Sequence, residues 1–282
     1  MRAAGLRWHV QEMGPGTGSP MGSPPKILLL HGTGASTHSW RRILPLLAPH
    51  FSLLALDLPG HGFTEMPLAE RMSLPGMSQM VGGLLQRLEF EPDLVVGHSA
   101  GAAVLARMVL DDTIRPRAMV SLNGALMPLP GVSSQLFPAA ARILAGTSVV
   151  PWIFSLHAAN RDLVARLPGN TGSRMLPDDL RSYRRLLLNP GHVSAALQMM
   201  AHWDLRSLAA DLPGLRLPVT LIVGGNDRMI PPADAERLRA ILPQASIVRL
   251  DGLGHLAHEE QPEKIAELIT AACDDARTLA AT

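Results

Sequence analysis

The chain has 282 residues, of which 47% are hydrophobic and 17% are charged, so it can bury a sizeable core and has no signature of disorder. Its formal net charge of +1 excludes any argument from charge for a nucleic-acid partner. The single cysteine, Cys273, cannot form an internal disulfide, and no stretch is a clean membrane span or signal peptide. We therefore expect a soluble, cytoplasmic protein from a reducing compartment, with no nucleic acid as partner.

Short apolar runs recur along the chain and predict strands. A first strand is expected over residues 6–12, before a connection rich in glycine, serine and proline. Six further runs are continuously apolar, as in strands covered on both faces: residues 26–30, 51–56, 94–97, 118–122, 219–223 and 246–250. Helices are expected between and after them, at residues 41–48, 72–88, 102–111, 233–242 and 262–275. This alternation predicts an α/β fold with a mostly parallel, doubly wound sheet, whose strands carry polar motifs at their carboxyl ends.

One long stretch breaks the alternation. Residues 124–212 contain no obvious strand, but several helical pieces that prolines and glycines interrupt. The stretch lies between the fourth and fifth buried runs, so the chain leaves the sheet there and returns to it. We expect residues 1–123 and 213–282 to form the core, and residues 124–212 to form a helical lid over the carboxyl ends of the strands.

The run at residues 94–97 leads directly into Gly-His-Ser-Ala-Gly at residues 97–101 and then into a helical stretch. A strand that turns abruptly into a helix needs glycines where the chain approaches itself, and Gly97 and Gly101 supply them. The turn displays the Ser99 hydroxyl at a helix N-terminus, where free N–H groups and the helix dipole favour negative charge. Ser99 is therefore the candidate nucleophile.

A serine nucleophile needs a base, and the base needs a group that fixes its tautomer. Asp227 follows the fifth buried run and His255 follows the sixth, so both are expected in the same layer as Ser99. Other candidates fit less well: Asp57 is interpreted as a turn residue held by an Asx hydrogen bond, and Asp251 is too close in sequence to His255. His258 is expected at the surface, where the last helix begins.

Charge that develops on a substrate oxygen requires preorganised N–H donors. Ala100, directly after the nucleophile, offers one backbone N–H at the start of a helix. Thr33, in the His-Gly-Thr-Gly turn at residues 31–34, is the candidate for the second, because glycines there let the backbone approach a substrate. Ala100 and Thr33 are therefore expected to form an oxyanion hole.

Five motifs together resemble the α/β-hydrolase superfamily, and they span almost the whole chain: residues 31–34, 57–62, 97–101, 224–227 and 254–255. The order Ser99, Asp227, His255 is also that of the superfamily, and the resemblance implies an α/β-hydrolase fold with an inserted lid. More narrowly, residues 31–40, 121–125 and 199–205 resemble magnesium-chelatase accessory proteins of bacteriochlorophyll biosynthesis. That resemblance implies a role beside magnesium insertion into protoporphyrin IX, with magnesium-chelatase subunits as partners.

The first interpretation is a serine hydrolase that acts on a small apolar acyl substrate, such as an ester, without cofactor or metal. Serine in place of aspartate at residue 99 argues against epoxide hydrolase and haloalkane dehalogenase chemistry. Other reactions on the same scaffold remain open, because a fold does not determine its chemistry. The tentative substrate pocket is apolar and comes from the lid, although packing of the lid itself could explain the same residues: Leu126, Met127, Trp152, Phe154 and Met199.

The second interpretation is a binding or chaperone protein that holds a tetrapyrrole intermediate for magnesium chelatase. His157, His192 or His202 could then ligate a porphyrin-bound magnesium, and lid arginines could meet its propionates: Arg161, Arg166, Arg181, Arg184 and Arg185. The apolar segment at residues 148–156 could also make a weak contact with a membrane surface.

Overall fold

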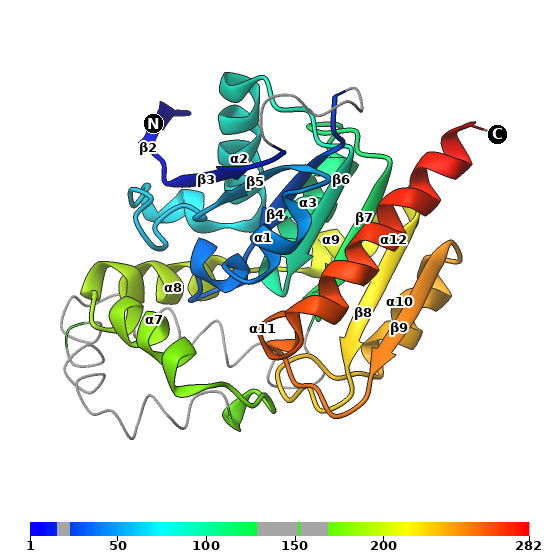
Figure 1. Ribbon diagram of the computed structural model, residues 1–282. Coiled ribbons are helices and arrows are strands. Elements are labelled where there is room, and N and C mark those ends of the chain that lie inside the picture. The colour runs from blue at the N-terminus through cyan, green and yellow to red at the C-terminus, as the bar shows by residue number, and fades with distance from the viewer. Residues whose placement is uncertain (16–22, 129–151, 153–168, 282) are drawn as a thin grey trace.

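The computed structural model describes residues 1–15, 23–128, 152 and 169–281 (Figure 1). Seven strands form the main sheet, in the order β3 (Val10–Met13), β5 (Ser52–Leu56), β4 (Lys26–Leu30), β6 (Leu94–His98), β7 (Ala118–Leu122), β8 (Val219–Gly224) and β9 (Ala245–Leu250). Only β3 runs antiparallel to its neighbour, and all other pairs in this sheet are parallel. The prediction of a mostly parallel sheet, with a strand at each of the six runs, is therefore confirmed, but β9 is not covered on both faces, since Ser246 and Arg249 are exposed.

The first predicted strand is wrong in one respect, because residues 6–12 are split between two sheets. β2 (Leu6–Arg7) pairs with β1 (Arg2–Ala3) in a separate hairpin, whose turn places Ala4 and Gly5 at positive φ. Trp8 continues this hairpin, because its backbone exchanges hydrogen bonds of 2.8 Å and 3.0 Å with Met1, and its buried side chain donates the indole N–H to the Ala3 carbonyl at 2.9 Å. The main sheet begins only at β3, so the predicted run belongs to two different pairings.

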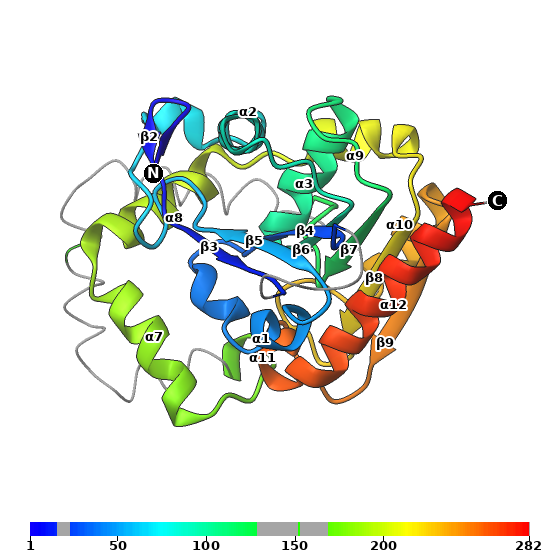
Figure 2. The same cartoon turned by 45° about the horizontal axis from the view of Figure 1, so that its top comes forward.

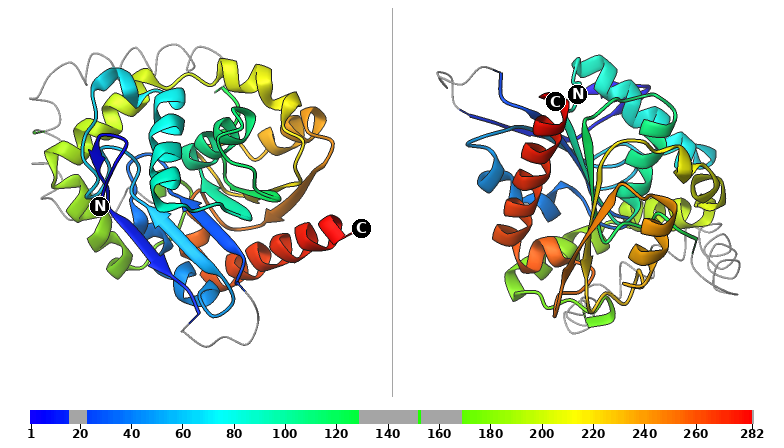
Figure 3. Two further views of the ribbon diagram at one scale, coloured as in Figure 1. Left: turned by 90° about the horizontal axis from the view of Figure 1, so that it is seen from above. Right: turned by 90° about the vertical axis from the view of Figure 1, so that its right-hand side faces the viewer.

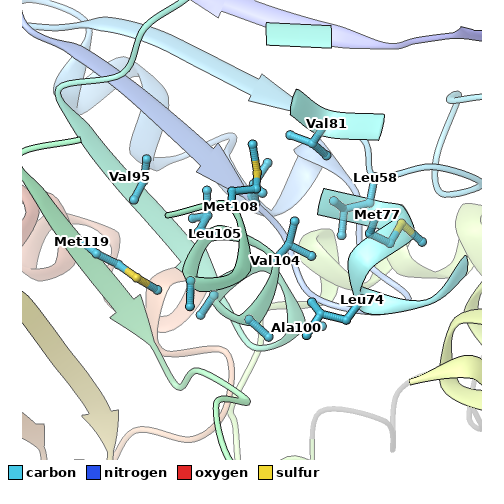
Figure 4. Close-up of a cluster of buried hydrophobic side chains, with 14 of the residues drawn as sticks. Leu58, Leu74, Met77, Val81, Val95, Ala100, Val104, Leu105, Met108 and Met119 are labelled. Carbon is cyan, nitrogen blue, oxygen red and sulfur yellow. The ribbon is translucent and has the colours of Figure 1, made fainter. Parts of the chain in front are cut away.

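Helices cover both faces of the main sheet, as the alternation predicts (Figure 3). The helices α1 (Ile43–Leu47) and α12 (Pro262–Ala281) pack on one face. On the other lie α2 (Leu74–Leu88), α3 (Ala100–Leu110) and α10 (Asp234–Ile241). Figure 4 shows how Val104 and Met108 of α3 join Met77 of α2 and Val95 of β6 in one buried cluster. The sheet is thus a rigid middle layer, which fixes where the loops at its carboxyl edge lie.

Among the described helices, three more fall within the expected lid: α7 (Pro177–Leu187), α8 (Pro190–His202) and α9 (Arg206–Asp211). Figures 1 and 2 show α7 and α8 beyond the edge of the sheet, whereas α9 packs on α3 through the buried Leu208. Residues 129–151 and 153–168 lie outside the described residues, so the bounds 124–212 stay a prediction. Among the described helices, none is both long and apolar enough to cross a membrane.

A buried polar network joins α7 to the core. The Asp179 carboxylate of α7 is buried and forms ion pairs with Arg41 and, at 2.9 Å, with Arg42, which lie just before α1. Arg41 also reaches Glu259 at 2.7 Å, in the short helix α11 (Ala257–Glu260), and the Tyr183 hydroxyl of α7 donates to the same carboxylate. We call these five residues the α7 anchor.

Candidate active site

Ser99 occupies the turn between β6 and α3, with φ +52° and ψ −119°. This is a left-handed conformation that L-residues seldom adopt outside functional sites. A side chain at Gly101 would collide with the Leu30 carbonyl oxygen of β4, so glycine is required for the turn to close against the sheet. Ser99 as a residue is partly buried, and α3 begins at the next residue. The structure thus has the tight strand-to-helix turn that the Gly-x-Ser-x-Gly motif predicts.

Asp227 and His255 lie in the loops that follow β8 and β9, and their side chains meet. His255 Nδ1 and Asp227 Oδ2 are 2.8 Å apart, and both residues are buried. The second carboxylate oxygen accepts the backbone N–H groups of Met229 at 2.7 Å and Ile230 at 3.0 Å. Because a carboxylate only accepts hydrogen bonds, its contact with Nδ1 assigns the ring proton to Nδ1 and leaves a lone pair on Nε2. His255 is therefore in the tautomer that a general base requires.

The serine turn and the His255 loop are connected through His98. His98 Nε2 donates to the His255 carbonyl at 2.9 Å, and the two ring centroids are 4.7 Å apart. No hydrogen bond joins Ser99 Oγ to His255 within the described part of the chain. In free enzymes such catalytic contacts are often long and tighten only around a substrate. The three residues of the predicted triad thus lie at one edge of the sheet, with only the acid–base pair in hydrogen-bonding contact.

The loop that carries Thr33 lies directly beside the serine. A Cβ at Gly32 would stand only 2.9 Å from Ser99 Cβ, and the loop turns back through a bond from the Ala35 N–H to the Gly32 carbonyl. His31 secures the base of the loop, because Nε2 accepts the Leu58 N–H at 2.9 Å and Nδ1 donates to the Gly32 carbonyl at 2.7 Å. Burial lowers the pKa of His31 to about 3, so this imidazole is neutral near pH 7.

Beside the site, the sequence argument missed Asn123 and gave His192 a different role. Asn123, directly after β7, donates its side-chain amide to Asp227 Oδ2 at 2.6 Å. His192 of α8 accepts the Gly62 N–H at 3.0 Å through Nδ1 and donates to the Gly34 carbonyl at 3.1 Å through Nε2. Both ring nitrogens of His192 are therefore engaged with the backbone, which argues against the expected role as a magnesium ligand. No spacing in the sequence connects either residue to the loops that it contacts.

Two alternative candidates also need correction. His258 is buried rather than exposed, with its ring centroid 4.4 Å from that of His98 and 4.9 Å from that of Trp40. Asp57 holds its turn by hydrogen bonds to residues farther away in the sequence than the expected Asx bond reaches. Its carboxylate accepts the Thr37 N–H at 2.7 Å and the Phe63 N–H at 2.9 Å. Asp251 is exposed and pairs with Arg249, away from His255. None of these replaces Asp227 or His255.

The tentative pocket residues have different environments. Leu126 and Met199 are fully buried in the cluster that α2 and α3 share, and Met127 packs against it. Met199 is the member that reaches the site, since its sulfur accepts the Thr33 hydroxyl at 3.4 Å. Trp152 is 55% exposed, and Phe154 lies outside the described residues. Among the described pocket candidates, Met199 is thus the one that forms a hydrogen bond with the Thr33 loop.

The other ligand candidates of the lid are only partly described. His202 Nδ1 contacts the Gln198 carbonyl at 2.8 Å within its own helix, and Arg181 forms an exposed ion pair with Asp178. His157, Arg161, Arg166 and most of the segment at residues 148–156 lie outside the described residues.

Comparison with known proteins agrees with this geometry. Residues 25–262 match the family described as alpha/beta hydrolase fold. The chain is 37% identical to the magnesium-chelatase 30 kDa subunit of Rhodobacter capsulatus over 271 residues, covering 95% of this chain and 91% of that one. It is 26% identical to the pimeloyl-[acyl-carrier protein] methyl ester esterase of Aeromonas hydrophila, covering 88% and 95% of the two chains.

A solved structure gives the same result for the fold. The crystal structure of an alpha/beta hydrolase fold protein from Burkholderia ambifaria superposes with a TM-score of 0.76 at 26% identity, and covers 94% of each chain. The resemblance to magnesium-chelatase proteins and to the superfamily, first inferred from the motifs, is confirmed by these relatives. The chain belongs to the α/β-hydrolase fold family.

Proposed function

We propose that this protein is a serine hydrolase that cleaves an ester or related acyl compound with an apolar body. The observation that carries the proposal is the buried 2.8 Å contact between His255 Nδ1 and Asp227, beside a serine held at positive φ. An esterase among its relatives supports the ester as substrate class. Ser99 is the nucleophile, His255 the general base and Asp227 the group that orients the imidazole.

The reaction follows from these roles. Ser99 Oγ attacks the acyl carbonyl while His255 Nε2 takes its proton, and the Asp227 carboxylate stabilises the imidazolium that forms. The backbone N–H groups of Ala100 and Thr33 receive the charge on the carbonyl oxygen. The imidazolium then gives its proton to the departing alcohol, and a water molecule, activated by the same base, releases the acid from Ser99.

The similarity to a magnesium-chelatase subunit supports a context for the substrate. In this proposal the ester is an apolar intermediate or esterified by-product of bacteriochlorophyll biosynthesis, near the magnesium insertion step, and chelatase subunits are the partners. The second candidate is an accessory protein that binds a tetrapyrrole without cleaving it, and the same relative favours it. The two differ in whether Ser99 reacts.

The test is labelling of the purified protein with a fluorescent fluorophosphonate, read by gel and by mass spectrometry. We expect the wild type to be modified at Ser99, and Ser99→Ala and His255→Ala to lose the label. Ser246→Ala is the matched control, because this serine is exposed on β9 and its loss leaves the site intact. A folded wild-type protein that takes no label contradicts the hydrolase, and titration with protoporphyrin and its magnesium form then tests the second candidate.

A further inference from the structure

The carboxylate of Asp227 is held from two strands. Asp227 follows β8, and Asn123 follows β7, its parallel neighbour in the sheet. The backbone N–H of Asn123 donates to the Ile222 carbonyl of β8 at 2.8 Å, which extends the ladder past the end of the strand. Asn123 has φ +46°, a conformation that asparagine tolerates better than most residues, and its side chain is buried. This backbone geometry aims the amide across the sheet edge at Asp227.

Four donors converge on the Asp227 carboxylate. Oδ1 accepts the two backbone N–H groups of Met229 and Ile230, and Oδ2 accepts His255 Nδ1 and the Asn123 amide. Because the carboxylate has only acceptors, the amide must present its NH₂ group, at 2.6 Å from Oδ2. Among the described residues, Asp227 is the only hydrogen-bond partner of the Asn123 side chain. Within the described part of the chain, the Asn123 amide therefore donates only to Asp227 Oδ2.

We propose that Asn123 is a positioning residue of the active site, which fixes the plane of the Asp227 carboxylate and shares Oδ2 with His255. This inference rests on the proposed function for its catalytic meaning, since Asp227 orients the base only if His255 is one. A shared Oδ2 is a weaker acceptor toward His255 than an unshared one, because part of its charge is already compensated by the amide. Asn123 thus limits how strongly the carboxylate holds a protonated imidazole.

Loss of the amide has a definite consequence for the contact between His255 and Asp227. With one donor fewer on Oδ2, the carboxylate accepts the His255 Nδ1–H more strongly, so the proton of this hydrogen bond moves downfield in the NMR spectrum. The other titratable groups that face this ring are His98, at 4.7 Å between centroids, and His258, which contacts His98. Burial lowers the pKa of both, that of His258 to about 3, so both are neutral near pH 7. A change in the Nδ1 proton signal therefore reports the contact with Asp227.

The experiment compares Asn123→Gly with Asn226→Gly. Glycine at residue 123 removes the amide but accepts the positive φ, so backbone strain does not confuse the result. Asn226 is the matched control: it lies on the Asp227 loop, is exposed, and its amide donates to the Gly252 carbonyl rather than to the carboxylate. Two quantities are measured at pH 7, namely the rate of fluorophosphonate labelling and the NMR chemical shift of the His255 Nδ1 proton.

For Asn123→Gly we expect about a tenfold slower labelling at pH 7 and a downfield shift of the His255 Nδ1 proton, while Asn226→Gly keeps the wild-type values. If Asn123→Gly melts at lower temperature but leaves the Nδ1 proton unchanged, Asn123 is structural only and the inference is overturned. The NMR readout needs no catalysis. A wild-type protein that takes no label, with an Nδ1 proton that still shifts in Asn123→Gly, therefore removes the proposed function and keeps the positioning role.

Discussion

At residue 32 the presence of a hydrogen instead of a methyl group determines where Ser99 lies. The Cβ that alanine would add there stands 2.9 Å from Ser99 Cβ and 3.0 Å from His98 Nδ1. Neither neighbour can move easily, because Ser99 begins a helix against the sheet and His98 is fixed to the His255 carbonyl. The glycine therefore sets the separation between the Thr33 loop and the serine turn.

We expect Gly32→Ala to slow fluorophosphonate labelling at least tenfold, because a shift of a few tenths of an ångström separates the proposed nucleophile, Ser99, from the proposed base, His255. The overpacking also lowers the free energy of unfolding by about 1–3 kcal/mol. Labelling kinetics and urea denaturation measure the two effects. Gly169→Ala is the matched control, since its added methyl group meets no atom within 4 Å. Equal labelling rates for the two variants contradict the assigned closeness of the loops.

The candidate triad was predictable at the scale of single residues, but its supports were not. Ser99, Asp227 and His255 each follow an apolar run, so their place at one sheet edge follows from chain order alone. Asn123 also follows such a run, but its contact with Asp227 depends on β7 and β8 being neighbours, which no local pattern states. His258 was misjudged because its burial comes from Trp40 and His98, which lie more than a hundred residues earlier in the chain.

At the scale of elements, α7 is attached to the core by ionic contacts, whereas α2 and α3 pack on it through apolar side chains. Asp179 is the only buried residue of α7, so its ion pairs with Arg41 and Arg42 carry much of the attachment to the core. The neighbouring Asp178 differs sharply, because its pair with Arg181 is exposed on both sides. Exposed pairs contribute little to stability, whereas a buried carboxylate without its partners is costly.

We expect Asp179→Ala to release α7 more often and to lower the free energy of unfolding by about 1–3 kcal/mol, a range reduced because Arg41 and Arg42 are partly exposed. Limited proteolysis within residues 177–187 should accelerate, and denaturant unfolding gives the stability change. Asp178→Ala provides the matched variant on the same helix and should stay within about 0.5 kcal/mol of the wild type. Similar behaviour of the two variants would falsify the importance of the α7 anchor.

At the scale of elements, the strands were predicted best where both of their faces are buried. Apolar runs predicted the parallel strands within one or two residues. In β6 and β7 the strand is covered on both faces and has no polar side, whereas β9 is partly exposed. The predicted helix at residues 41–48 begins instead as a short 3-10 helix, Thr37–Trp40, capped by Ser36, before α1. The split of residues 6–12 was missed because β2 pairs with β1 whereas β3 pairs with β5, and no pattern within these residues states their partners.

At the scale of the whole molecule, buried histidines link stability to acidity. Burial lowers the pKa of six described histidines: His31, His38, His61, His98, His192 and His258. The folded protein therefore binds fewer protons than the unfolded chain below the ordinary histidine pKa of 6.5. Their contribution to stability is complete above that pH, and it is lost as pH falls toward about 4 for His38 and about 3 for His31 and His258.

We expect the free energy of unfolding to fall steeply from pH 6.5 downward, by as much as about 1.4 kcal/mol per pH unit for each histidine that stays neutral when folded. Urea denaturation at a series of pH values from 8 to 5 measures the slope. His258→Phe should reduce that slope by about 1.4 kcal/mol per pH unit, because it removes one of these histidines. The described part of the chain gives the ring nitrogens of His258 no hydrogen bond, so the substitution breaks none there. His50→Asn, at an exposed position, should leave the slope unchanged.

The positive φ of Ser99 implies that this fold is not at its own stability optimum. A non-glycine residue in that region costs of order 1–3 kcal/mol, and glycine would remove much of the cost without disturbing any hydrogen bond that the structure gives the Ser99 side chain. Selection for folding alone would therefore favour glycine at residue 99. The presence of serine despite this cost in stability is best explained by a function of its hydroxyl group.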